Sequence, residues 1–250
     1  MRSRIAFHTA AVLLTAAAAF AQPAPAPAPD PKEPPPRQEG SVDLAFVSTT
    51  GNSDTQSLGL GGTYIYRPDL WELKWKAGFI RNETDDEVSA EAFTFLFRAD
   101  RTLSDRLSAF GSYDYLRDRF AGLENRHTLA GGLSYLLIDA APHRLQVDGG
   151  LGYTNEERLD GDDISTMIGL VGLAYDLKIS ETAEFSDDMR FDFSLSDGED
   201  WRWQNVAAIS AKLTTLFSLK LSNTIRYMNS PPRGFDTTDT ITAVALVAKF

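Results

Sequence analysis

The sequence predicts an all-β protein, a 12-stranded antiparallel transmembrane β-barrel. The chain begins with an export signal, apolar and polar residues alternate from Gly40 onward, and the last strand ends on Phe250. A period of two with an aromatic final residue is typical of outer-membrane barrels, whose strands face lipid on one side and the barrel interior on the other. Tyr and Trp also fall on the apolar positions of these strands, near strand ends.

The first element is a secretory signal peptide at residues 1–21. Arg2 and Arg4 precede an apolar run from Ala10 to Phe20, and the segment ends in the A-x-A pattern Ala19-Phe20-Ala21. The run is too short to span a bilayer as a helix. We therefore expect export through a cleaved signal peptide to the outer membrane of a Gram-negative bacterium.

The second element, residues 22–39, is a linker that holds eight of the twelve prolines. Proline lacks the backbone donor and fixes φ, so this stretch builds neither helix nor sheet. A ligand for a partner and a spacer toward the cell wall are alternative roles. Residues 40–250 then form one β-barrel domain by length.

Composition excludes several classes of function. The chain has no cysteine, which removes disulfides, thiolate metal sites and a lipidated N-terminal Cys. Cleavage of the signal leaves 22 Lys and Arg against 35 Asp and Glu, and this acidic balance disfavours nucleic-acid binding. No cofactor is predicted.

Twelve strands follow one another with turns between them, an even number that returns the C-terminus to the side of the N-terminus. Short connections alternate with longer, often acidic ones, as expected for periplasmic turns and external loops. A tight reversal near Ser218 is expected to separate the tenth strand from the eleventh. The expected strands are 41–50, 54–66, 71–83, 87–100, 106–118, 125–138, 144–156, 163–177, 183–196, 200–217, 219–229 and 237–250.

The aromatic residues indicate which face looks outward, because a soluble barrel would carry its apolar residues inside. All Tyr and Trp lie on the apolar parity and gather toward strand ends, as in the interfacial girdles of membrane barrels. The predicted girdle residues are Tyr64, Tyr66, Trp71, Trp75, Tyr135, Tyr175, Phe217 and Phe250 on the periplasmic side, and Tyr113, Tyr115, Tyr153, Trp201, Trp203 and Tyr227 on the other. Two polar residues, Asp187 and Asn223, also fall on the lipid-facing positions. Asp187 is explained either by contact with water near a periplasmic turn or by a bulge that shifts the register. The sequence offers no explanation for Asn223.

The opposite parity predicts the residues that line the interior. Seven acids face eight bases, and this near balance favours a network of ion pairs over a strongly selective channel. Whether the interior conducts or is occluded stays open, since twelve strands lie between filled small barrels and water-filled porins. The predicted lining charges are Asp43, Glu72, Lys74, Lys76, Arg98, Asp114, Arg144, Asp148, Glu184, Asp188, Arg190, Asp192, Lys212, Lys220 and Arg226.

Three motifs carry a resemblance to a known family. Thr50-Gly51-Asn52-Ser53-Asp54-Thr55, then Arg117-Asp118-Arg119-Phe120-Ala121-Gly122, and Gly149-Gly150-Leu151-Gly152-Tyr153 resemble the bacterial salt-induced outer membrane proteins, which are also catalogued as a domain of unknown function. The likeness covers residues 40–250. It implies an outer-membrane barrel linked to salt or osmotic response, with no agreed activity and no catalytic residues to transfer.

The sequence contains little evidence of an enzymatic site. After the signal peptide the chain has two histidines, His127 on the lipid parity near an external loop and His143 in a periplasmic turn, so they cannot share a site. A pairing of His127 with a loop serine or with Asp118 is conceivable, but no spacing demands it. We therefore predict that the protein is not an enzyme.

Weak ligand sites lie at the external rim. The loop residues Asp160, Asp162 and Asp163 offer oxygen ligands for Ca²⁺ or Mg²⁺ but lack EF-hand spacing, so solvated acids are the simpler interpretation. Arg117, Arg119 and Arg126 are candidates to meet lipid phosphates.

The leading hypothesis is a structural barrel or a passive small-solute pore of the envelope. An outer-membrane enzyme acting on lipids or peptides, and a soluble periplasmic barrel that binds an apolar ligand, are the alternatives. The expected partners are outer-membrane lipid and lipopolysaccharide, and the barrel-assembly machinery through the C-terminal strand. The oligomeric state stays open.

Overall fold

The computed structural model describes residues 35–49, 55–84 and 87–250. The predicted signal peptide, most of the predicted linker, and residues 50–54 of the first family motif lie outside the described residues. The chain divides into two units, Met1–Pro35 and Pro36–Phe250, and all the strands belong to the second.

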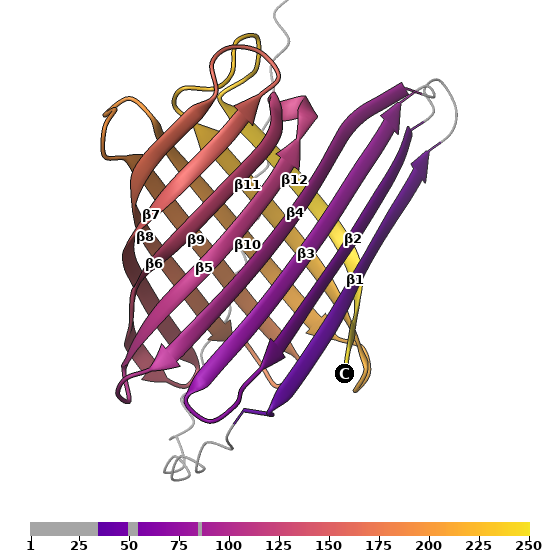
Figure 1. Ribbon diagram of the computed structural model, residues 1–250. Coiled ribbons are helices and arrows are strands. Elements are labelled where there is room, and N and C mark those ends of the chain that lie inside the picture. Colours follow the sequence, from indigo (N-terminus) through magenta and orange to yellow (C-terminus); the bar gives the residue numbers. More distant parts are fainter. Residues whose placement is uncertain (1–34, 50–54, 85–86) are drawn as a thin grey trace, which may run out of the picture. The chain divides into compact units, whose positions relative to one another are not determined.

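Twelve antiparallel strands form one closed barrel, and each strand pairs with its neighbours in chain order (Figure 1). β1 pairs with β12 to complete the ring, so the predicted fold class is confirmed. Within the described residues no helix is long and apolar enough to cross a membrane, and η1 (Arg119–Ala121) is a single 3-10 turn. The strands are β1 (Gln38–Thr49), β2 (Thr55–Tyr66), β3 (Trp71–Thr84), β4 (Glu87–Thr102), β5 (Leu107–Asp118), β6 (Leu123–Ala140), β7 (His143–Arg158), β8 (Ile164–Lys178), β9 (Ala183–Ser194), β10 (Trp201–Lys212), β11 (Phe217–Met228) and β12 (Thr238–Lys249).

The pairing register carries the sequence alternation around the barrel wall. Residues directly opposite one another on neighbouring strands point to the same face. Tyr64 pairs with Trp75 and Trp75 with Phe97, which gives an aromatic row, whereas the adjacent row pairs Lys74 with Arg98. The aromatic row and large aliphatic residues such as Leu151 lie on the outer surface, where Leu151 is 57% exposed. A water-soluble barrel with an apolar interior would show the reverse.

The turn between β10 and β11 differs from the expectation. It lies at the end of the barrel that is predicted to face the periplasm, which we call the periplasmic end, and we call the opposite end the external end. The prediction of a reversal near Ser218 is wrong, because β10 ends at Lys212 and the turn occupies residues 213–216. The hydroxyl oxygen of Thr214 accepts hydrogen bonds from the backbone N–H groups of Leu216 and Phe217, at 3.2 and 2.9 Å. Such a side-chain bond stabilises a turn at this position and leaves Ser218 buried within β11.

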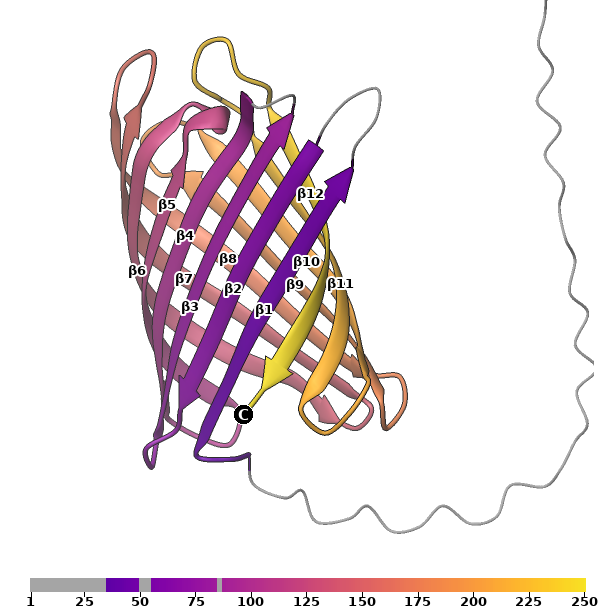
Figure 2. The same ribbon diagram turned by 90° about the vertical axis from the view of Figure 1, so that its right-hand side faces the viewer.

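The seam that closes the barrel is much shorter than the others. β1 and β12 pair over Ser41–Leu44 and Leu246–Lys249, with two further backbone hydrogen bonds of 2.8 and 2.9 Å between Gly40 and Phe250. β1 and β2, by contrast, pair along their full length from Gln38 to Thr49. Figure 2 shows β12 diverging from β1 toward the external end.

Candidate functional site: the charged barrel interior

Arg98 on β4 makes a bridge through the periplasmic half of the interior. Its guanidinium donates hydrogen bonds to Asp100 at 2.8 Å, to Asp148 at 2.6 Å and to the hydroxyl of Ser134 at 2.8 Å. Asp148 belongs to β7, and two strands separate it from β4, so this contact leaves the wall and enters the interior. The guanidinium also lies 4.2 Å from the ring centroid of Phe110, a cation–π contact.

A second bridge lies nearer the external end. Arg190 on β9 bonds Asp192 at 2.9 Å and reaches Asp114 on β5 at 3.1 Å, across three intervening strands. Asp43 and Lys220, 2.5 Å apart, connect β1 with β11 on the other side of the barrel. Arg98, Arg190 and Lys220 therefore each meet at least one acid, as members of an interior network of ion pairs do.

The interior is packed on one side and water-accessible on another. Phe110, Ala130 and Leu170 form a buried apolar cluster that fills the space beside β5, β6 and β8. Lys76, Asp188 and Gln204 point inward by register, yet their side chains are exposed to solvent. Water-accessible polar side chains inside the barrel indicate a narrow aqueous space along β3, β9 and β10.

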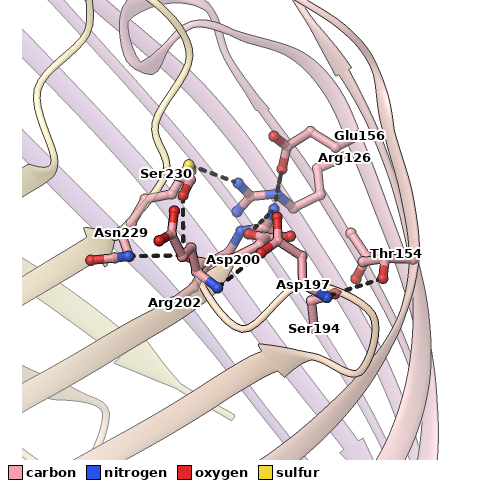
Figure 3. Close-up of polar contacts among 12 residues, drawn as sticks. Arg126, Thr154, Glu156, Ser194, Asp197, Asp200, Arg202, Asn229 and Ser230 are labelled. Atoms are coloured by element: carbon pink, nitrogen blue, oxygen red, sulfur yellow. Dashed lines mark hydrogen bonds and ion pairs between the residues drawn. The ribbon is translucent and has the colours of Figure 1, made fainter.

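The external end holds an arginine cluster around one carboxylate, shown in Figure 3. The Glu156 side chain is fully buried and lies 2.6 Å from Arg158, 2.7 Å from Arg126 and 3.0 Å from Arg202. Arg202 also lies 3.2 Å from Asp200. A buried carboxylate needs such partners because its desolvation is costly. We call Arg126, Glu156, Arg158, Asp200 and Arg202 the outer arginine cluster.

The loop between β11 and β12 folds onto this cluster. The Arg158 guanidinium donates to the Ser230 carbonyl at 3.0 Å, and the Asn229 and Ser230 side chains bond the Glu199 carbonyl. Pro232 in the same loop is fully buried. These contacts tie the loop to β7 and to the β9–β10 connection.

A direct bridge joins opposite walls beneath this loop. Arg226 on β11 lies 3.3 Å from Asp118 on β5, and these strands stand six places apart in a ring of twelve. Gly122, with a φ of 77°, lies so close to the loop that an added Cβ would meet the Phe235 ring at 2.6 Å. The bridge and the loop together narrow the external entrance.

The remaining predicted lining charges gather at the periplasmic end. Glu72 bonds Arg67 at 2.8 Å and lies 3.6 Å from Lys74, while Glu184 lies 3.1 Å from Lys249. Arg144 is half exposed and lies 3.6 Å from Asp176. Lys212 is exposed beside a cavity of about 430 Å³ that Glu184 and Ser218 also line.

Sequence reasoning missed most of the outer arginine cluster. Arg126 is a predicted candidate for contact with lipid phosphates at the rim, but its guanidinium lies inside against Glu156. Of these five residues only Arg158 lies outside the expected strands, but none of the five was among the predicted lining charges. Their parity was nevertheless the available signal, since Glu156 lies eight residues after Asp148 on the same face of β7.

The histidines do not form a catalytic arrangement. A 2.8 Å hydrogen bond joins the His127 ring to the Tyr113 hydroxyl on the outer face, whereas Asp118 lies inside against Arg226. The two residues therefore do not pair. His143 bonds the Tyr175 hydroxyl at 2.7 Å near the periplasmic rim.

The acidic loop between β7 and β8 borders a cavity of about 620 Å³ together with Arg158 and Arg233. Asp163 accepts a hydrogen bond from the Arg158 backbone N–H at 3.1 Å. In the part of the chain that the structure describes, no three acidic or histidine side chains lie close enough to hold a metal ion. At the same rim Glu124 accepts two hydrogen bonds from Arg119, which raises the pKa of that exposed guanidinium.

Aromatic side chains pack against one another on the outer face. Trp201 and Tyr227 stack with ring centroids 4.9 Å apart at the external end, and Tyr64 lies 5.7 Å from Trp75 at the periplasmic end. These pairs hold the rings in fixed positions at two levels of the wall.

Comparison with known proteins places the chain in a family. The family model described as "Protein of unknown function, DUF481" matches residues 42–250. The chain belongs to the DUF481 family. It is also 23% identical over 196 residues to the uncharacterized protein YdiY of Escherichia coli (strain K12), a match that covers 78% of this chain and 75% of that protein.

A solved structure with little sequence similarity shares the fold. The NanC porin superimposes with a TM-score of 0.50 at 10% identity, over 84% of this chain and 98% of the porin. An outer membrane channel from Pseudomonas putida F1 has a TM-score of 0.48 at 11% identity, over 85% of this chain and 95% of that chain. At such low identity the likeness to the porin supports the barrel architecture alone.

Proposed function

We propose that this protein is an integral outer-membrane barrel that provides a narrow, passive pathway for small polar solutes. The observation that supports this role most directly is the solvent exposure of Lys76, Asp188 and Gln204 inside the wall. Porins use such water-filled interiors lined by charged rings for conduction. The apolar and aromatic outer surface fits placement in lipid.

The pathway is constricted. Cross-strand ion pairs span the interior at the levels of Arg98 and Arg190, and the bridge between Arg226 and Asp118 narrows the external entrance. Paired acids and bases leave little net charge along the path, so we expect weak ion selectivity and low conductance. The link with salt or osmotic response rests on the family resemblance and stays a prediction.

Conductance of the refolded protein in a planar bilayer tests the proposal. We expect small channel events from the unaltered protein. Arg226→Ala removes the bridge to Asp118 and should enlarge the events or prolong their open times. Arg233→Ala, an exposed arginine in the loop that follows β11, serves as the matched control and should leave the events unchanged.

The absence of any channel event from either the unaltered protein or Arg226→Ala, in bilayers shown to contain the inserted barrel, would overturn the pore proposal. It would favour a purely structural role for a barrel with a sealed interior.

A further inference from the structure

A polar stripe crosses the outer surface of the barrel on β9 to β12. Asp187 pairs in register with Ala207, Ala207 with Asn223, and Asn223 with Thr242. No register shift interrupts these pairings, so a bulge does not explain Asp187. We define the stripe as Asp187, Asn205, Asn223, Thr240 and Thr242.

The central members of the stripe, Asn223 and Thr242, lie in the middle parts of their strands, whereas Asp187 pairs in register with Tyr175 of the predicted periplasmic girdle. Asn223 is the seventh of the twelve residues of β11, and Asp187 is the fifth of the twelve of β9. Asn205 lies two residues below Trp203, toward the periplasmic side. In the middle parts of β6, β7 and β8, the outward residues Leu133, Leu151 and Val171 are all apolar and exposed.

The stripe residues bond to one another but retain unused capacity. The Asn205 amide donates to Asp187 at 2.6 Å, and the Asn223 amide donates to the Thr242 hydroxyl at 2.9 Å. An asparagine amide offers two N–H donors and an acceptor oxygen, so a single bond leaves further groups available. In lipid, such groups find no water and are costly to leave unpaired.

The edge of β12 adds backbone groups to the same face. Beyond Leu44 and Leu246 no described residue of β1 pairs with β12, so the edge from Thr238 to Ala245 lacks its strand neighbour. Unpaired N–H and C=O groups are costly within a bilayer. Side-chain and backbone polarity thus concentrate on one face, beside the incomplete seam.

We propose that this face binds a second copy of the same chain within the membrane. A two-fold contact presents each surface to itself, so it requires groups that act as both donors and acceptors. The amides of Asn205 and Asn223 and the hydroxyls of Thr240 and Thr242 meet this requirement. The small side chain of Ala207, between Asp187 and Asn223, permits close approach. The inference requires that the barrel lies in lipid, but not that its interior conducts.

Disulfide cross-linking tests the inference, because the chain has no cysteine of its own. In the refolded full barrel in lipid vesicles, Asn223→Cys and Thr242→Cys should each give a covalent dimer on mild oxidation. Leu133→Cys, on the far wall with an exposed outward side chain, should not. The unaltered protein should also have the mass of a dimer in mild detergent.

A second variant tests whether the polar side chains of the stripe cause the association. Replacing Asp187, Asn205 and Asn223 together by leucine should convert the dimer to a monomer that remains folded, as judged by heat-modifiable migration. A monomeric unaltered protein, with equal cross-linking at residues 223 and 133, would overturn the proposal. Channel conductance is measured independently, so failure here leaves the pathway proposal untouched.

Discussion

Glu156 shows how a single residue organises the external end of the barrel. Its carboxylate is fully buried and would strongly destabilise the barrel if it had no ion-pair partners. Three guanidinium groups lie within 3.0 Å of it. Arg158 and Arg202 extend the contacts to Ser230 and Asp200. One carboxylate therefore links β6, β7, β10 and the loop between β11 and β12.

Removal of the Glu156 charge should destabilise the barrel. Glu156→Gln leaves three arginines close together without their counter-ion, and breaking a buried pair of this kind costs about 3 kcal/mol. Denaturant unfolding in detergent, followed by tryptophan fluorescence, measures the change. Glu157→Gln, an exposed neighbour bonded to Asn125, is the control and should change the unfolding free energy by less than about 0.5 kcal/mol. Equal stability of the two variants would contradict the role assigned to Glu156.

The β6–β7 hairpin shows how close backbone approach constrains an element. Gly132 pairs with Gly150, and an added Cβ at Gly132 would lie 2.2 Å from the Gly149 carbonyl oxygen. At Gly149 itself an added Cβ would meet no atom within 4 Å. Two glycines of the same hairpin thus have different structural roles.

Alanine substitution should distinguish these glycines. Gly132→Ala forces the two backbones apart, and overpacking of this kind costs about 2 kcal/mol. Gly149→Ala adds a methyl group to open space and should change stability by less than about 0.5 kcal/mol. The unfolding midpoint in urea measures both, and a more damaging effect at Gly149 would refute the packing argument.

Sequence alternation predicted the barrel, the strand count and the parity of its faces, because period two follows directly from strand geometry. It could not predict features that depend on three-dimensional approach. The Arg98 bridge to Asp148 joins residues 50 positions apart, and the contact between Arg226 and Asp118 spans 108. In the sequence, the polar stripe appears only as two polar residues at lipid-facing positions, Asp187 and Asn223. The pairing register that aligns them cannot be derived from the sequence of either strand alone.

At the scale of the whole molecule, one wall separates two environments. The charged side chains of the inward face are paired or in contact with water, whereas outward residues such as Leu151 and Val171 are apolar and exposed. The proposed pathway and the proposed dimer both depend on this separation. The first uses the aqueous side of the wall, and the second uses the lipid side.

The most direct test of this separation is the reaction of introduced cysteines with a charged, membrane-impermeant thiol reagent present on both sides of lipid vesicles. Lys76→Cys and Gln204→Cys should react, whereas Leu151→Cys and Val171→Cys should react only after unfolding in urea. Rapid modification at residues 151 and 171 of the folded protein, with protection at 76 and 204, would contradict the account.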